Sequence, residues 1–577
     1  MREELITAIE GAVRTLLREA QAPEDPPAFS LEIPRQKEHG DFACNAAMVL
    51  AKPLRKPPRE IAARLVELLT AAPGPVARAE VAGPGFVNLW LATDRWQDLI
   101  TTLLRRPEAF GRSELLGGRR IQVEFLSANP TGPITIGHGR QAVLGDCIAR
   151  LLIAAGGKVT REYYFNNGGR QMRTLGASVR ARYLELIGRA APPPEDALRD
   201  DALPWPESIG GLPVVFPRDG YRGEYIREIA AALRDEHGDG LADEPPDGRF
   251  RSEAERIVFA EIRATTAALG IHFDVYFNEM SLYEEGKLEE TLGGLRAKDL
   301  VYESEGATWL RATALGLDRD RVLVKSTGEP TYLLPDVAYH REKFARGFDL
   351  VIDVQGADHH GQFPFVRAAA AALGCDPARI ELVLHQMVSL TKGGQQVRQG
   401  KRAGNFVTVD EVMRQIGADV FRFFMIQRRP DSHLDFDLDL ASETDWTKNP
   451  AFYVQYAHAR SCGVAREAEK RGVPEPDSEA PHAARLALPE EVELLRKLGE
   501  LPEVVERAAQ TREPHHVAYY LREVAGLWNP YLQDGKRHRI LSDDAELTAG
   551  RLALCAAVRA VLANGLALLG MSAPERM

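Results

Sequence analysis

The stretch Ser127–Asp146, SANPTGPITIGHGRQAVLGD, decides the fold of this chain. Two prolines, three glycines and one histidine stand ahead of an apolar helical pattern that continues to Gly156. The preceding residues 121–128, IQVEFLSA, are typical of a strand, and residues 158–165, KVTREYYF, form a second strand pattern. A strand, a crossover helix and a second strand of these lengths predict a βαβ unit of a parallel sheet.

The glycine-rich turn at the start of this helix suits a phosphate group. A helix start exposes unpaired backbone N–H groups and carries a partial positive charge. Gly137 and Gly139 would let a ligand approach the main chain, and His138 can donate a hydrogen bond to a phosphate oxygen. The turn matches neither the dinucleotide nor the P-loop motif. The alternative is that these glycines only allow the helix to pack tightly on the strand.

Composition limits the class of protein. The 577 residues are 45% hydrophobic, which predicts several domains with sizeable cores. The net charge of −11 argues against a surface coated by nucleic acid, although a local basic patch such as residues 536–539 is compatible with it. Five cysteines without C-x-x-C spacing indicate neither a zinc knuckle nor a disulfide framework. No signal peptide or membrane span is expected, and we predict a cytoplasmic protein.

Four regions differ in their patterns. Residues 1–112 combine two helix patterns with a strand and predict a small α/β domain. Residues 113–410 carry the βαβ pattern and further strands at DRVLVKS and FDLVIDVQG, with an insertion at about 185–300 whose first part, to about 250, is rich in loops. Residues 411–450 would form a hinge segment, and residues 451–577 are helical throughout.

Several ordered motifs resemble those of arginyl-tRNA synthetases, a family of class I aminoacyl-tRNA synthetases. They lie in the sequence at residues 39–52, 81–91, 123–146, 161–171, 331–362, 401–411, 449–460 and 567–577. The resemblance implies an α/β fold: a class I Rossmann-like catalytic domain with a parallel sheet, a small N-terminal α/β domain that contacts tRNA, and an all-α C-terminal anticodon-binding domain. It implies that arginine is activated with ATP to arginyl-adenylate and passed to the 3′ end of tRNA(Arg), with release of AMP and pyrophosphate.

The same resemblance implies the partners. These are tRNA(Arg), arginine and ATP, with Mg²⁺ accompanying the ATP and no metal bound by the protein itself. We expect a monomer that does not associate with membranes. Attack by a carboxylate on a phosphorus atom needs no general base at neutral pH, so catalysis would consist of positioning and charge stabilisation.

The resemblance assigns the ATP-binding and catalytic residues. ATP would be held by Gly137, His138, Gly139, Asp358, His359, Arg398 and Lys401, and the catalytic residues would be Thr135, His138 and Lys401. Thr135 replaces the first histidine of the family's tetrad, which keeps a hydroxyl donor but removes an imidazole. The second signature reads Arg398-Gln399-Gly400-Lys401, where Lys401 would neutralise charge on the leaving pyrophosphate. Some members instead carry a lysine at the place of Gly132, so Lys401 is expected to be needed here.

Arginine recognition requires carboxylates, because a guanidinium is always charged and presents a fixed fork of donors. By resemblance, the substrate arginine would contact Asn129, Glu162, Asn166, Tyr332 and Asp336. A capping role for Asn129 and a core role for Tyr332 are the alternatives. Many relatives carry an acid after Asn166, but this chain has Asn167, which is assigned no charged role.

The helical region would read the anticodon through aromatic side chains that stack on bases. Tyr453, Tyr456 and Arg460 recur at helical spacing on one face, and Trp528 and Met577 lie where the family approaches the anticodon. The alternative for each aromatic residue is a place in the core.

Two rival functions deserve a test. GADHHG, with Asp358, His359 and His360, is also typical of manganese phosphoesterases, which need further aspartate-rich motifs that do not appear upstream. The departures at Thr135 and at residues 398–401 would also fit a synthetase-like protein that binds tRNA without charging it.

Overall fold

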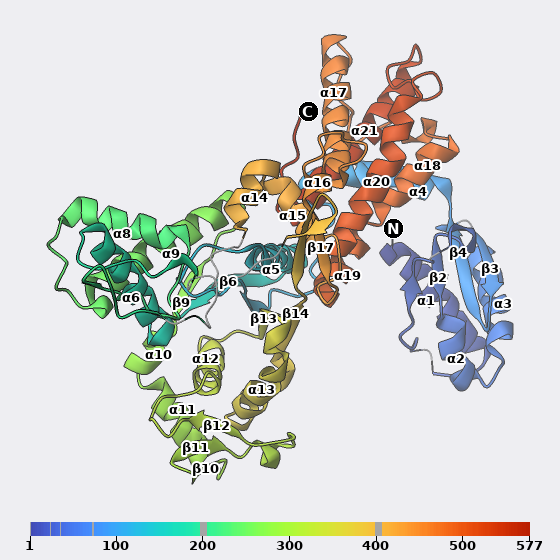
Figure 1. The fold of residues 1–577 in the computed structure, drawn as a ribbon. Helices are drawn as coiled ribbons and strands as arrows, with labels where there is room; N and C mark the ends of the chain where they lie inside the picture. The colour runs from blue at the N-terminus through green and yellow to red at the C-terminus, as the bar shows by residue number, and fades with distance from the viewer. Residues whose placement is uncertain are drawn as a thin grey trace.

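The computed structural model describes residues 2–23, 25–34, 36–71, 74–196, 203, 205–397 and 407–577. A parallel sheet lies at the centre, the small N-terminal domain stands to one side, and long C-terminal helices rise above the sheet (Figure 1). The predicted fold class is confirmed.

The central sheet has the strand order β14-β13-β5-β6-β9, and all neighbours are parallel. Its strands are β5 (Arg120–Glu124), β6 (Lys158–Phe165), β9 (Val275–Asn278), β13 (Leu350–Gly356) and β14 (Ile380–His385). The predicted βαβ unit is confirmed as β5, α5 (Ile136–Ala154) and β6. Gly145 of α5 meets the ring of Phe125, at 2.1 Å from where its Cβ would lie, so a glycine is required for this helix to sit close to the sheet.

The other face of the sheet is covered by α12 (Leu333–Ala345), and α13 (Phe363–Ala372) connects β13 to β14. Side chains alternate between faces along a strand, so Glu124 points to the face opposite Phe125. The contacts of Glu124 with Lys343 of α12 agree with this. The helix that follows the glycine-rich turn and the helix that carries Asp336 therefore lie on opposite faces and meet at the carboxyl ends of the strands.

The N-terminal domain is an antiparallel sheet in the order β1-β2-β4-β3, packed against helices. Its elements are α1 (Arg2–Glu19), β1 (Leu31–Glu32), β2 (Phe42–Cys44), α2 (Ala46–Leu54), α3 (Pro58–Thr70), β3 (Val76–Ala82) and β4 (Phe86–Leu91). The next helix, α4 (Thr93–Arg105), packs mainly against α18 and α21 of the C-terminal region. The first predicted region thus contains a helix that belongs by packing to the helical domain.

The predicted insertion contains two structural units. The first unit consists of α6 (Gly169–Leu186), β7 (Ser208–Ile209), β8 (Leu212–Pro213), α8 (Glu224–His237), a π-helical turn (Pro246–Phe250) and α9 (Arg251–Ala268). After β9 returns to the central sheet, the second unit consists of α10 (Met280–Glu284), α11 (Lys287–Arg296), β10 (Val301–Ser304), β11 (Ala307–Leu310) and β12 (Arg321–Val324). The predicted strand DRVLVKS is β12, and it lies in a separate antiparallel sheet rather than beside β13.

A linking segment follows β14. It contains β15 (Val388–Lys392), β16 (Gln395–Gln396), α14 (Val409–Ile416), α15 (Ala418–Ile426), β17 (Leu434–Asp437) and α16 (Leu438–Ala441). Thr408 caps α14 because its hydroxyl accepts from the amide of Glu411 at 3.1 Å while the Glu411 carboxylate accepts from the Thr408 amide at 2.8 Å. Within the predicted hinge segment 411–450, α15 buries every side chain from Val420 to Ile426.

The C-terminal helices are α17 (Pro450–Lys470), α18 (Pro489–Gly499), α19 (Leu501–Thr511), α20 (His515–Gln533) and α21 (Ala545–Leu568). The predicted all-helical region is confirmed. By length and composition α21 could cross a membrane, but its side chains are largely buried against α17 and α20. It is the core helix of this domain.

Candidate active site

Three carboxylates form a row across the centre of the sheet. Asp353 of β13 is in register with Glu124 of β5, which is in register with Glu162 of β6. All three are buried. Like charges on adjacent strands repel one another, so the row needs cations beside it.

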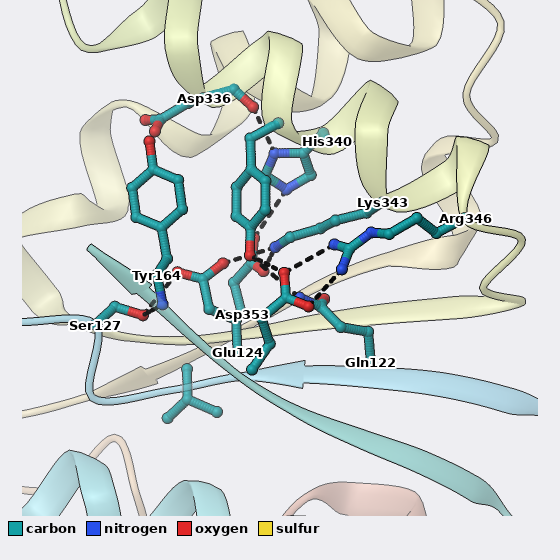
Figure 2. Close-up of polar contacts among 12 residues, drawn as sticks. Gln122, Glu124, Ser127, Tyr164, Asp336, His340, Lys343, Arg346 and Asp353 are labelled. Atoms are coloured by element: carbon teal, nitrogen blue, oxygen red, sulfur yellow. Dashed lines mark hydrogen bonds and ion pairs between the residues drawn. The ribbon is translucent and has the colours of Figure 1, made fainter. Parts of the chain in front are cut away.

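The cations come from α12, at three-residue intervals. Lys343 Nζ lies 2.7 Å from Glu124 Oε2 and 2.6 Å from Asp353 Oδ1 (Figure 2). His340 Nε2 lies 2.9 Å from Asp353 Oδ2, and Arg346 reaches Glu162 with both terminal nitrogens, at 2.6 and 2.8 Å. Burial opposes ionisation of Asp353, but Lys343 and His340 outweigh it and lower the pKa of its carboxyl. These pairs fix α12 on the sheet.

Glu162, which was expected to contact the substrate arginine, pairs with an arginine of the protein itself. Both of its oxygens already accept from Arg346, and the Tyr339 hydroxyl donates to one of them. Three of the roughly four acceptor positions of the Glu162 carboxylate are therefore used within the protein. The arginine that pairs with Glu162 in the structure is Arg346 of the protein itself.

Two further carboxylates of this cluster form no ion pair with a lysine or arginine among the described residues. Asp336, in the first turn of α12, accepts from Gln362 Nε2 at 2.6 Å, and burial raises the pKa of its carboxyl to about 7. Glu279, just after β9, accepts from Tyr164 Oη and Asn166 Nδ2, both at 2.7 Å. Burial also raises the pKa of Glu279. The negative charges of Glu124 and Glu279 raise the pKa of Asp336 further, whereas His340 acts to lower it.

The cluster therefore carries excess negative charge. Five buried or half-buried carboxylates, Glu124, Glu162, Glu279, Asp336 and Asp353, face two permanent cations, Lys343 and Arg346. The excess falls on Asp336 and Glu279, at the carboxyl ends of the strands, where parallel sheets bind ligands. This arrangement can receive a cationic group.

The remaining residues expected at the arginine lie around this pair. Asn129 and Asn166 are joined, since the Asn166 amide donates to Asn129 Oδ1 at 3.0 Å, and Asn129 Nδ2 donates to Gln171 at 2.9 Å. Tyr332 stands one turn before Asp336 on α12 and is 70% exposed, so the alternative of a core role is excluded.

The turn before α5 is built as a helix cap. Thr135 is the N-cap residue, and its amide and its hydroxyl oxygen lie 3.3 and 3.2 Å from His138 Nδ1. A Cβ on Gly137 would meet no atom within 4 Å, which leaves the main chain open to a ligand there.

Gly139 serves packing instead of ligand approach. A Cβ at this position would lie 2.6 Å from Phe421 and 2.8 Å from Val409, and the Gly139 amide already donates to the Thr135 carbonyl at 2.9 Å. The expected contact of Gly139 with ATP stays a prediction, and it would not use this amide, which donates within the helix.

Comparison with known proteins places this geometry in a family. Three family descriptions match in order: "Arginyl tRNA synthetase N terminal domain" at residues 3–91, "tRNA synthetases class I (R), catalytic domain" at 100–190 and 243–419, and "DALR anticodon binding domain" at 454–577. The arginine–tRNA ligase of Desulfotalea psychrophila is 46% identical over 549 residues, which cover 95% of each chain. This chain belongs to the arginyl-tRNA synthetase family. It is an enzyme of that family.

Other relatives agree with this assignment. The arginine–tRNA ligase of Salinibacter ruber is 46% identical over 551 residues, covering 95% of this chain and 96% of that one. The solved arginyl-tRNA synthetase of Thermus thermophilus superposes with a TM-score of 0.73 at 25% identity, and the match covers 99% of this chain and 100% of that structure.

The structure describes only some of the other residues that were predicted to contact ATP. The GADHHG motif forms a 3₁₀ turn (Ala357–Gly361) directly after β13, and His359 is exposed there. The side chain of Asp358, as well as Arg398 and Lys401, lie outside the described part of the chain.

The phosphoesterase alternative gains no support from the family. Among the side chains that the structure describes, the group close enough together to hold a metal ion is Glu513, His515 and His516. It lies on the turn between α19 and α20, and not on the GADHHG turn. Family membership favours the synthetase.

The helical domain of the synthetase brings part of the predicted aromatic group together. Tyr456 stacks on Trp446, with ring centroids 4.1 Å apart, and Arg460 lies over Tyr456 at 5.7 Å. Tyr453 also stacks on Trp446, with ring centroids 5.9 Å apart, and Met577 is exposed. Trp446 was not predicted, because it precedes α17 in a loop and shares no helical period with the tyrosines.

Trp528 does not join this group. Its ring is fully buried, its Nε1 donates to Ser461 Oγ at 2.8 Å, and it stacks on Tyr531. The expected approach of Trp528 to the anticodon is wrong, because a buried indole with a satisfied N–H is a core residue.

Proposed function

We propose that this chain activates arginine with ATP to arginyl-adenylate and transfers arginine to the 3′ end of tRNA(Arg), giving AMP and pyrophosphate. The observation that carries the proposal is the pair Asp336 and Glu279, two carboxylates without a cation in a cluster whose other carboxylates are neutralised. A guanidinium supplies the missing charge and, with its planar fork of donors, can reach two carboxylates at once. Family membership supports the same reaction.

Within this proposal the remaining residues hold the rest of the substrates. Asn129, Asn166 and Tyr332 lie beside the two carboxylates that bind the guanidinium. They contact the backbone and the aliphatic part of the substrate arginine. Gly137, His138 and Thr135 lie at the N-terminus of α5 and receive the triphosphate, together with Asp358 and His359. Arg398 and Lys401 neutralise the pyrophosphate as it leaves. Mg²⁺ enters with ATP as part of the substrate.

We further propose that Trp446, Tyr453, Tyr456 and Arg460, with Met577 near the chain end, receive the anticodon. A cavity of about 470 Å³ opens beside Arg460 between α17 and the end of α20, which offers room for a base next to a stacking surface. We also propose that the enzyme acts as a monomer in the cytoplasm.

An aminoacylation assay with each of the twenty amino acids and unfractionated tRNA tests the proposal. Arginine alone is expected to be attached. A tRNA-binding protein without charging activity would show no exchange of label between pyrophosphate and ATP in the presence of arginine and tRNA. Manganese-dependent hydrolysis that needs neither arginine nor tRNA would instead point to the phosphoesterase.

The arginine KM is expected to depend on pH through Asp336. Because burial raises the pKa of this carboxyl to about 7, the ionised form that pairs with a guanidinium is lost as the pH falls through 7. Only the ionised fraction is competent to bind, so the arginine KM should rise by about tenfold between pH 8 and pH 6. Steady-state pyrophosphate exchange at saturating ATP measures it, and a flat profile would contradict the assignment.

A further inference from the structure

The loop between β5 and α5 is held from outside the central sheet by Tyr225. The hydroxyl of this residue donates a hydrogen bond to the Thr131 carbonyl at 2.7 Å. Thr131 lies between Asn129, which faces the proposed arginine site, and Thr135, which caps α5. One side chain therefore contacts the middle of the loop that joins the two substrate sites.

Two glycines make room for the Tyr225 ring. A Cβ on Gly132 would lie 2.9 Å from the Tyr225 hydroxyl oxygen and 3.0 Å from Cζ. A Cβ on Gly223, just before α8, would lie 2.4 Å from Cε1 of the same ring. Neither glycine has a left-handed φ, so close approach of the ring, and not backbone conformation, accounts for both. The ring occupies a slot that exists because two side chains are missing.

Tyr225 comes from a part of the chain that the family's catalytic-domain description does not match. That description covers residues 100–190 and 243–419, and Tyr225 belongs to the stretch between them. The stretch is anchored on α6, since α8 packs along α6 and the Tyr221 amide donates to Ser178 Oγ at 3.0 Å. The loop that carries the family signature thus depends on a residue outside the matched segments.

We propose that Tyr225 is a positioning residue for adenylate formation. Its hydroxyl fixes the Thr131 carbonyl, and its ring supports the loop at Gly132, so that Asn129 and the Thr135–His138 cap keep their relative places. Because catalysis here consists of positioning, a loop that loses this support should lower turnover more than it changes the fold.

Replacing Tyr225 with phenylalanine removes the hydroxyl and keeps the ring. We expect kcat of arginine-dependent pyrophosphate exchange to fall by about 3- to 10-fold, which corresponds to the loss of one hydrogen bond. Amide hydrogen exchange should become faster in the peptide that contains residues 129–135 and stay unchanged in peptides of α5 and β6.

Tyr183→Phe is the matched control. Its hydroxyl also donates to a backbone carbonyl, that of Gly238, within the same helical unit, but it does not reach the loop. The rate of pyrophosphate exchange by Tyr183→Phe should equal that of the wild type. The proposal is overturned if Tyr225→Phe and Tyr183→Phe give the same rate of pyrophosphate exchange. It is also overturned if Tyr225→Phe leaves amide hydrogen exchange in residues 129–135 unaltered.

A second pair of variants tests the slot. Gly132→Ala should lower the exchange rate because its Cβ would press on the Tyr225 ring, whereas in a Tyr225→Ala background the same change should add no further loss. If the losses caused by Gly132→Ala and Tyr225→Ala add, Gly132 does not act by making room for the Tyr225 ring. The experiments that measure pyrophosphate exchange rest on the proposed function. Should the wild type activate no amino acid, the hydrogen-exchange comparison still decides the role of Tyr225.

Discussion

Replacing Asp336 with asparagine is expected to raise the arginine KM by about 100-fold while the protein remains folded. In the proposed complex the Asp336 carboxylate pairs with a guanidinium in a half-buried place, and removing one partner of such a pair costs about 2 to 5 kcal/mol. Asparagine keeps the shape and can still accept from Gln362, so the loss is one of charge. Pyrophosphate exchange over a range of arginine concentrations, with ATP saturating, measures it.

The free protein should not be destabilised by this change. The folded-state pKa of Asp336 is raised to about 7, above that of an unfolded aspartate, so its contribution to stability is lost as the pH rises from about 4 through 7. At pH 8 the wild type bears the cost of an ionised carboxylate without a cation, and asparagine removes that cost. The melting temperature of Asp336→Asn at pH 8 should equal or exceed that of the wild type.

Glu342→Gln is the control on the same helix. Its carboxylate pairs with Lys287 of α11 at 3.4 Å. It should leave the arginine KM unchanged, and Asp336→Asn should also flatten the pH profile of the KM. An unchanged KM in Asp336→Asn would end the assignment of this carboxylate to the guanidinium.

Asp336 could be predicted from sequence, whereas Glu279 could not. Asp336 follows Tyr332 at helical spacing in a motif shared with a known family. Glu279 follows a four-residue strand inside a stretch that was interpreted as an insertion, and nothing local connects that strand with α12. The two carboxylates come together only because β9 returns to the edge of the parallel sheet beside β6. A crossover of that length leaves no short-range signal.

The pairing of Glu162 with Arg346 could not be predicted for a similar reason. Each of the three strands carries an acid, but the register that aligns Asp353, Glu124 and Glu162 is a property of the assembled sheet. The signal that could have identified their partners is the spacing of His340, Lys343 and Arg346 on one helix. Three basic residues on one face of an apolar helix indicate a buried row of acids opposite.

Gly139 and Trp528 illustrate the limit of residue type as evidence. A glycine at a helix start serves equally for ligand approach and for packing, and only the position of Phe421 distinguishes them. A tryptophan on an amphipathic helix serves equally for stacking on a base and for filling a core. Helices could be predicted from the sequence because they depend on periodicity, which is local.

The catalytic and helical domains are joined by a buried charge. Arg422 of α15 is fully buried and donates to the Leu569 carbonyl at the end of α21, to the Leu269 carbonyl at the end of α9, and to Asp146 of α5, at 2.8, 2.8 and 2.6 Å. Helix ends carry partial negative charge, so one guanidinium satisfies two helix ends and a carboxylate together. A Cβ on Gly570 would lie 2.0 Å from this guanidinium, which leaves no room for a side chain there.

Arg422→Met is therefore expected to be among the most destabilising single substitutions in the chain. It keeps most of the volume but leaves two helix-end carbonyls without a donor and removes the buried partner of Asp146, which keeps only Arg150 and Arg161. Breaking a buried pair of this kind costs about 3 to 5 kcal/mol in the free energy of unfolding. The midpoint of urea denaturation should fall accordingly. Arg471→Met, which removes an arginine from an exposed pair with Glu467 on α17, should change the midpoint far less.

A double variant separates charge pairing from packing at this joint. In Asp146→Asn combined with Arg422→Met neither partner remains charged, so the loss should be smaller than the sum of the two single losses, although Arg150 and Arg161 also contact Asp146. Additive losses would mean that Arg422 acts through the carbonyls of α9 and α21 alone. If the urea midpoint of Arg422→Met equals that of Arg471→Met, the buried charge of Arg422 does not stabilise the interface between the two domains. In that case the apolar contacts of the helical domain hold it to α5.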